Sequence, residues 1–158
     1  MMISERSTFG VRCIWCLMML DALSGCQSPD GPQKYPVRGV VEINGSPAQQ
    51  VAVTFHHERA DTPGNLRYPS AVTDANGAFV LSSEGDRDGA VEGNYKVTFA
   101  WMSSPDLDAF DMLGGKFSKP ESSLFTAQVP VEAGDLPPFQ LVVPESEIRL
   151  SGRPRPSP

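Results

Sequence analysis

The sequence predicts an all-β protein, an antiparallel β-sandwich of about seven strands, and three observations favour this fold class. Apolar and polar residues alternate with a period of two in several segments after residue 35, as in strands with one buried face. The 158 residues include 14 Gly and 15 Pro, which favours many turns and short strands over long helices. Hydrophobic residues make up 40% and charged residues 20%, so the chain can form a packed core.

The alternation also predicts which side chains face the core. In the first two strands these are Val37, Val41, Ile43, Val51, Val53 and Phe55. A short strand is expected over Ser70–Thr73, and the later inward-facing residues are Phe79, Leu81, Tyr95, Val97, Phe99, Trp101, Phe125, Ala127, Val129, Val131, Phe139, Leu141 and Val143. Tight turns are expected at Asn44-Gly45 and at Asp74–Gly77, because Asn and Gly accept positive φ angles and Asp caps turns.

One segment departs from this pattern. Residues 102–122 do not alternate, and Leu107, Phe110 and Leu113 have partial helical spacing. A short helix or a turn is therefore expected before Gly114-Gly115.

The N-terminal segment is predicted to be an export signal. Arg6 and Arg12 accompany the apolar run 13–20, which is far shorter than the roughly 20 residues that span a bilayer. Leu23-Ser24-Gly25-Cys26 follows at the spacing of a cleavage site, and it resembles the lipobox of bacterial lipoproteins. The resemblance implies that residues 1–25 are a removed signal peptide and that Cys26 is acylated.

The remaining chain divides into three parts. Residues 26–34 are a polar tether, and the stretch from Gln27 to Lys34 spans on the order of 25 Å when extended. Residues 35–143 form the sandwich. Residues 144–158 contain several prolines and almost no core residue, so they are expected to be a flexible tail.

Three motifs in the sandwich resemble, in order and spacing, those of the carboxypeptidase regulatory-like domain. They are Gly39-Val40-Val41 with the turn and strand 44–55, then Thr73-Asp74-Ala75-Asn76-Gly77-Ala78-Phe79, then Gly93-Asn94-Tyr95-Lys96-Val97. The resemblance implies a transthyretin-like sandwich of a kind found in small envelope lipoproteins. It implies no peptidase activity, because the sequence contains no peptidase module and a shared fold does not supply a function.

Charge and cysteine content exclude several functions. The net charge of −6 disfavours binding to nucleic acid, and it leaves the lipid on Cys26 as the expected membrane attachment. The three cysteines are Cys13, Cys16 and Cys26, so no thiol chemistry is available after residue 26. Cys13 and Cys16 have the C-x-x-C spacing, but both lie in the apolar signal run and are interpreted as part of it.

Few residues are candidates for catalysis or metal binding. His56 and His57 are the only histidines. As neighbours on a strand they point to opposite faces, His57 inward and His56 outward, so they are expected to be surface or strand-end residues and not a metal pair. Asp74–Gly77 lacks the spacing of a calcium loop. Asp106, Asp108 and Asp111 are expected to lie in a solvated loop, with calcium binding as the alternative.

The sequence thus favours a non-enzymatic, membrane-anchored module of the cell envelope, structural or protein-binding, that uses no cofactor or metal and faces the periplasm or the exterior. Its expected partners are the membrane, through Cys26, and an envelope protein or glycan. Carbohydrate binding is an alternative if Trp101, Tyr68 and Tyr35 form an exposed stacking platform, although the register places Trp101 in the core or at its rim. A hydrolase that uses His57 and loop carboxylates is a second alternative.

Overall fold

The structure is a computed structural model that describes residues 31–131 and 135–150. All its helices and strands lie in residues 32–158, one of the two units into which the chain divides. Of the other unit, residues 1–31, only Gly31 is described. The predicted signal peptide, Cys26 and most of the tether therefore lie outside the described residues.

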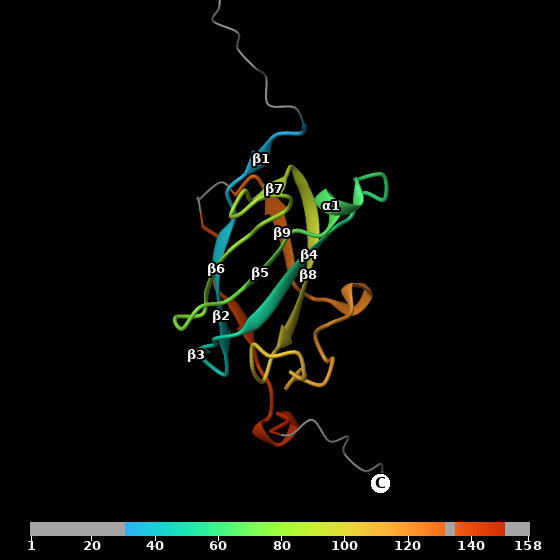
Figure 1. The fold of residues 1–158 in the computed structure, drawn as a ribbon. Coiled ribbons are helices and arrows are strands. Elements are labelled where there is room, and N and C mark those ends of the chain that lie inside the picture. The colour runs from blue at the N-terminus through green and yellow to red at the C-terminus, as the bar shows by residue number, and fades with distance from the viewer. Residues whose placement is uncertain (1–30, 132–134, 151–158) are drawn as a thin grey trace, which may run out of the picture. The chain divides into compact units, whose positions relative to one another are not determined.

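Two sheets make up the sandwich (Figure 1). In the first, β2 (Arg38–Ile43) pairs with β10 (Phe139–Leu141), β3 (Ser46–Pro47) and β6 (Ala78–Val80). The second has the order β5 (Ser70–Val72), β4 (Val51–His57), β8 (Gly93–Trp101) and β9 (Thr126–Val129). A two-stranded ribbon joins β1 (Lys34–Tyr35) to β7 (Ala90–Val91). The described helices are α1 (Gly64–Arg67) and two 3₁₀ turns, Pro120–Ser122 and Glu145–Glu147, and none of them is long and apolar enough to cross a membrane.

The predicted all-β sandwich is confirmed, including the number of main strands. Among the described residues, seven strands have three or more residues, namely β2, β4, β5, β6, β8, β9 and β10. Their pairings are antiparallel with one exception, since β10 runs parallel to β2, with Phe139 opposite Val41. The chain crosses from one sheet to the other between β9 and β10, and it enters beside β2 in the same direction.

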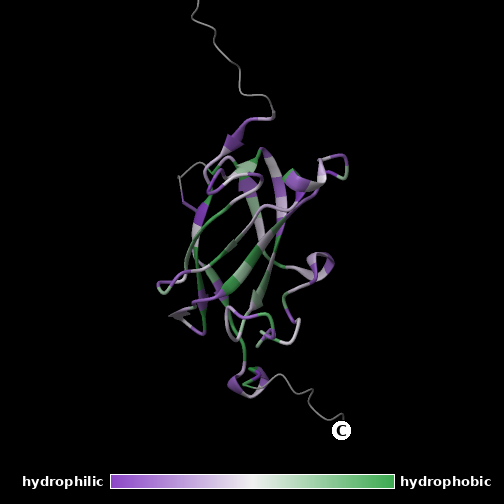
Figure 2. Cartoon of the chain, viewed as in Figure 1, coloured by the Kyte–Doolittle hydropathy of each residue, from purple (hydrophilic) through white to green (hydrophobic). Residues whose placement is uncertain are grey.

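The core lies between the two sheets and consists of the side chains that the alternation predicted. Val37, Val41, Val53, Phe55 and Val97 have no exposed surface. Aromatic rings contact one another between the two sheets. For example, the ring centroids of Phe55 and of Phe79 in the opposite sheet are 6.3 Å apart. Figure 2 shows this segregation, with hydrophobic residues along the strands and hydrophilic residues in the connecting loops.

Two predicted turns form as expected. Asn44 and Gly45 have φ angles of 53° and 79°, and the Asn44 side chain bonds both backbone groups of Val143, which fixes the end of β10. The Asp74 carboxylate accepts from the backbone N–H groups of Asn76 and Ala78, so it closes the predicted turn.

The irregular segment 102–122 forms turns and no helix apart from the 3₁₀ turn at its end. Leu113 packs in the core, whereas Leu107 is fully exposed, so the partial helical spacing does not mark a buried face. Asp106 and Asp108 are exposed, as expected of a solvated loop, whereas Asp111 is half-buried. Its carboxylate accepts from the N–H groups of Trp101, Leu113 and Gly115 at 2.7–2.9 Å and shapes the loop.

The first part of the predicted tail is packed on the sandwich and is not a flexible extension from residue 144. Ile148 contacts the core, and the N–H of Arg149 donates to the carbonyl of Met112 at 2.8 Å. Glu147 forms an ion pair with Lys116 at 2.7 Å. The domain therefore extends to about residue 149, and only residues 151–158 of the tail lie outside the described part.

The start of the sandwich also differs from the prediction by a residue, because Lys34 belongs to β1 and not to the tether. Its Nζ lies 2.8 Å from Asp88 and 2.6 Å from Glu84. The Asp88 carboxylate also accepts from the N–H groups of Ser83, Glu84 and Gly85. Burial raises the pKa of Asp88, but the Lys34 ammonium and these backbone donors outweigh it, and the pKa lies well below its usual range.

Replacing Asp88 with asparagine is expected to lower the free energy of unfolding by about 1–3 kcal/mol, since it removes a charged acceptor from four donors. Because the folded pKa is depressed, this stabilisation is present above the unfolded pKa of about 3.9 and is lost as the pH falls through the folded value. Denaturant unfolding of both proteins at pH 7, 4, 3 and 2 would measure it, and the difference between the two proteins should shrink as the pH falls below about 4. Asp86→Asn, in the same loop, is the control, and an equal loss in both variants would contradict the prediction.

Candidate functional site

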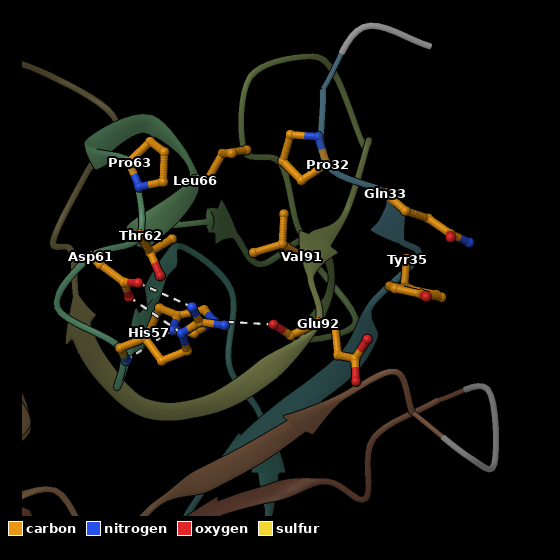
Figure 3. Close-up of a pocket in the computed structure, with 11 residues that line it drawn as sticks. Pro32, Gln33, Tyr35, His57, Asp61, Thr62, Pro63, Leu66, Val91 and Glu92 are labelled. Carbon is orange, nitrogen blue, oxygen red and sulfur yellow. Dashed lines mark hydrogen bonds and ion pairs between the residues drawn. The ribbon is translucent and has the colours of Figure 1, made fainter. Parts of the chain in front are cut away.

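A pocket opens at the end of the sandwich where β1 enters, and its volume is about 350 Å³. The loop that follows β4, with α1, forms one side, and β1 with β7 forms the other (Figure 3). Its lining residues are Pro32, Gln33, Tyr35, His57, Arg59, Asp61, Thr62, Pro63, Leu66, Val91 and Glu92. The pocket thus combines apolar walls with several polar groups, as expected of a recognition site.

His57 is the one histidine of this pocket, and both nitrogens of its imidazole ring are hydrogen-bonded to the backbone. The side chain is only 4% exposed, so the prediction that it faces inward is confirmed. Of the two expected positions, surface or strand end, His57 has the second, because it is the last residue of β4. Its Nδ1 accepts from the backbone N–H of Arg59 at 3.0 Å, which makes Nε2 the protonated nitrogen that donates to the carbonyl of Glu92 at 3.1 Å. The ring also packs on Tyr95, with centroids 4.7 Å apart.

This arrangement gives His57 a structural function. A general base needs a free lone pair within reach of the proton that it removes. Both nitrogens of His57 bond backbone atoms, so the ring links the end of β4 to the start of β8. Removing either bond to free a nitrogen would leave a backbone group without its partner.

The other charged groups of the pocket lie at its rim. Arg59 and Asp61 form a two-point ion pair at 3.0 and 3.3 Å, which lowers the pKa of the Asp61 carboxyl through the Arg59 hydrogen bond. Both side chains are more than 70% exposed, so solvent screens the pair. The Thr62 hydroxyl and the Glu92 carboxylate have no hydrogen-bond partner within the described part of the chain, and they remain available to a ligand.

His56 points to the opposite face of the same sheet, as predicted. Its Nε2 lies 2.8 Å from the hydroxyl of Thr98, and its ring lies 5.5 Å from that of Tyr68. Burial lowers the pKa of His56, while the Glu121 carboxylate raises it and the Arg67 guanidinium lowers it. The two histidines therefore belong to separate sites and do not share a ligand.

The three aromatic residues considered for a stacking platform do not come together. Tyr35 lines the pocket, and Tyr68 lies beside His56. Trp101 pairs with Val51 at the far end of β8, where it is half-buried and donates from Nε1 to the carbonyl of Gln49 at 3.0 Å. The prediction that Trp101 lies at the rim of the core is confirmed, and any aromatic site must be built on Tyr68 or Tyr35 alone.

No group of three or more His, Cys, Asp or Glu residues in the described ranges has the arrangement of a metal site. In segment 102–122, the Asp111 carboxylate accepts hydrogen bonds from the backbone N–H groups of Leu113 and Gly115.

Comparison with known proteins adds little to this description. No protein-family model and no curated protein matches the chain. Among solved structures, a 9R-lipoxygenase from Cyanothece PCC8801 is similar at 14% identity and a TM-score of 0.35. The similarity covers 75% of this chain but only 18% of the lipoxygenase, and at this TM-score it has no bearing on function.

Proposed function

We propose that the chain is a membrane-anchored lipoprotein of the bacterial cell envelope, with a carboxypeptidase regulatory-like, transthyretin-like domain that acts by structural or binding contacts and not by catalysis. The observation that carries the non-enzymatic part is the environment of His57, whose two ring nitrogens are bonded to the backbone. The pocket around it offers ligand contacts without an activated nucleophile or base.

The anchoring part rests on the lipobox-like segment and on the position of β1. Seven residues lie between Cys26 and Lys34, and Lys34 is fixed to the domain by Asp88 and Glu84. A chain of this length reaches on the order of 25–30 Å when extended. A lipid on Cys26 would hold the pocket end of the domain close to its membrane, on the periplasmic or exterior side.

Metabolic labelling with a fatty acid tests the anchor. We expect the wild-type chain to be labelled and to sediment with membranes, whereas Cys26→Ala remains unlabelled because it lacks the acylated thiol. Cys16→Ala is the matched control and should be labelled like the wild type. Equal labelling of Cys26→Ala and the wild type would overturn the lipoprotein assignment.

Two further measurements test the role of the domain. A broad hydrolase screen of the purified protein should show no activity, and an activity that is abolished by His57→Ala in a folded protein would refute the non-enzymatic proposal. Crosslinking in intact cells should recover a defined envelope component with the wild-type protein. Recovery of none would contradict a binding function.

A further inference from the structure

The outer face of the sheet β5-β4-β8-β9 differs in chemistry from the rest of the molecule. This face is formed by the strand residues that alternate with the core residues, namely Ala52, Thr54, His56, Ser70, Val72, Asn94, Lys96, Thr98, Ala100, Thr126 and Gln128. Lys96 is the one charged residue among them, although a fifth of the whole chain is charged. The face is therefore almost neutral and rich in hydroxyl groups.

The corresponding face of the other sheet is not of this kind. There Arg38 and Glu42 alternate along β2, and Gln140 of β10 donates to the Glu42 carboxylate at 2.6 Å. That face therefore carries charged and amide side chains, of which Gln140 and Glu42 bond each other. The neutral outer face of β5-β4-β8-β9 thus has the chemistry of a surface that receives an uncharged ligand.

A rigid aromatic group stands at one end of this neutral face. Tyr68 follows α1 and is 47% exposed. The Arg67 guanidinium lies 5.5 Å from its ring centroid, and the His56 ring meets it at an interplanar angle of 73°. These contacts hold the phenol ring in place beside β4, while about half of its surface remains open.

Hydrogen-bonding groups next to Tyr68 lack protein partners. The Thr98 hydroxyl donates to the carbonyl of Thr54, so Nε2 of His56 donates to Thr98 and Nδ1 is left as a free acceptor within the described part of the chain. The Nε of Arg67 is buried and has no hydrogen bond among the described residues. An exposed ring and a free acceptor therefore occur within one cluster, and the buried Nε of Arg67 lies behind them.

We propose that this cluster, built on Tyr68, His56 and Arg67, binds a neutral glycan chain. A sugar ring has an apolar face that packs on an aromatic ring, and its hydroxyl groups both donate and accept hydrogen bonds. Tyr68 supplies the aromatic surface, Nδ1 of His56 accepts from a sugar hydroxyl, and Arg67 and Thr98 supply the polar surroundings. The half-exposed Thr54 and the exposed Thr126 offer hydroxyl groups to further sugar units of the chain.

The chemistry of the face favours a glycan over two other occupants. A second copy or another protein would need an apolar interface core, whereas the strand residues here are mostly Ala, Ser and Thr. An acidic polymer would need several cations, and only Arg67 and Lys96 are at hand. This inference deepens the proposed function and rests on it in one respect, since the envelope position places the domain among envelope glycans.

The test uses the lipoprotein purified from membranes in a detergent without a sugar headgroup. Binding of neutral tetrasaccharides of glucose, N-acetylglucosamine and xylose would be measured by titration calorimetry. We expect at least one to bind, and Tyr68→Ala and His56→Ala to weaken it at least about tenfold. Tyr68→Phe should retain most of the affinity, because it keeps the ring.

Leu107→Ala, at a fully exposed side chain of segment 102–122, is the matched control and should bind like the wild type. Thermal unfolding of each variant shows whether it is folded. Absence of binding to all three sugars, or binding that is unchanged in a folded Tyr68→Ala variant, would overturn the proposal. A sedimentation change in Tyr68→Ala without a sugar effect would assign the face to self-association and also overturn it. Fatty-acid labelling of Cys26 is independent of these results, so failure of the glycan site and failure of the anchor are distinguishable.

Discussion

Replacing Phe139 with alanine is expected to lower the free energy of unfolding by about 3–5 kcal/mol, which is a large share of the stability of a domain of this size. The Phe139 side chain is 7% exposed and lies at the centre of an aromatic cluster. Its ring centroid is 5.3 Å from Phe99, 6.0 Å from Phe125, 6.3 Å from Phe79 and 6.4 Å from Phe55. These partners come from both sheets, so the cavity would loosen the contact between them.

Denaturant unfolding of the purified domain measures this loss. Gln140→Ala is the matched control, because Gln140 is the next residue of β10, is exposed, and should change stability by less than about 0.5–1 kcal/mol. A loss below about 1 kcal/mol for Phe139→Ala would show that the sheets are held together elsewhere. An equal loss in both variants would instead indicate that β10 as a whole is sensitive to substitution.

Phe139 also illustrates what alternation in a sequence can predict. The period of two correctly placed Phe139 and Leu141 on the inner face, because burial depends on the pattern along one strand. The same pattern contains no information about the neighbouring strand or its direction. The parallel pairing of β10 with β2 follows from how the chain crosses between sheets, and it could not be predicted from these residues.

Short segments without a repeating pattern escaped prediction for a related reason. Ala90 and Val91 form β7 inside a stretch that reads as a polar loop, and Ile148 anchors a segment that reads as a tail. Two or three residues are too few to show a period, and their structure depends on partners far along the chain. Lys34 and Asp88, for example, are 54 residues apart.

At the candidate sites too, the sequence predicted what depends on neighbouring residues and missed what depends on residues far along the chain. The sequence predicted that His56 and His57 face opposite sides of a strand, since this depends only on their adjacency. The burial of His57 depends on Glu92 and Gly93 of the neighbouring strand segment. The contact of His56 with Tyr68 depends on the loop and helix between them, and no motif indicates it.

The contact between Gly93 and His57 leads to the second large expected effect. Gly93 begins β8 with a φ angle of 155°, and a Cβ at this position would overlap Nε2 of His57 and lie 2.7 Å from its Cε1. His57 cannot move aside without breaking its bonds to Glu92 and Arg59. We therefore expect Gly93→Ala to lower the free energy of unfolding by about 2–5 kcal/mol, from backbone strain and overpacking together.

A double-mutant cycle separates the two causes. In a His57→Ala background the overlap disappears, so Gly93→Ala should cost only the backbone strain, about 1–3 kcal/mol. Gly64→Ala is the matched control, because Gly64 lies in α1 with no atom within 4 Å of the place that an alanine methyl group would take, and it should be neutral or slightly stabilising. If the costs of Gly93→Ala and His57→Ala simply add, the overlap is not what destabilises the variant. Coupling between them would instead establish that the His57 ring is packed against the start of β8, as the structure places it.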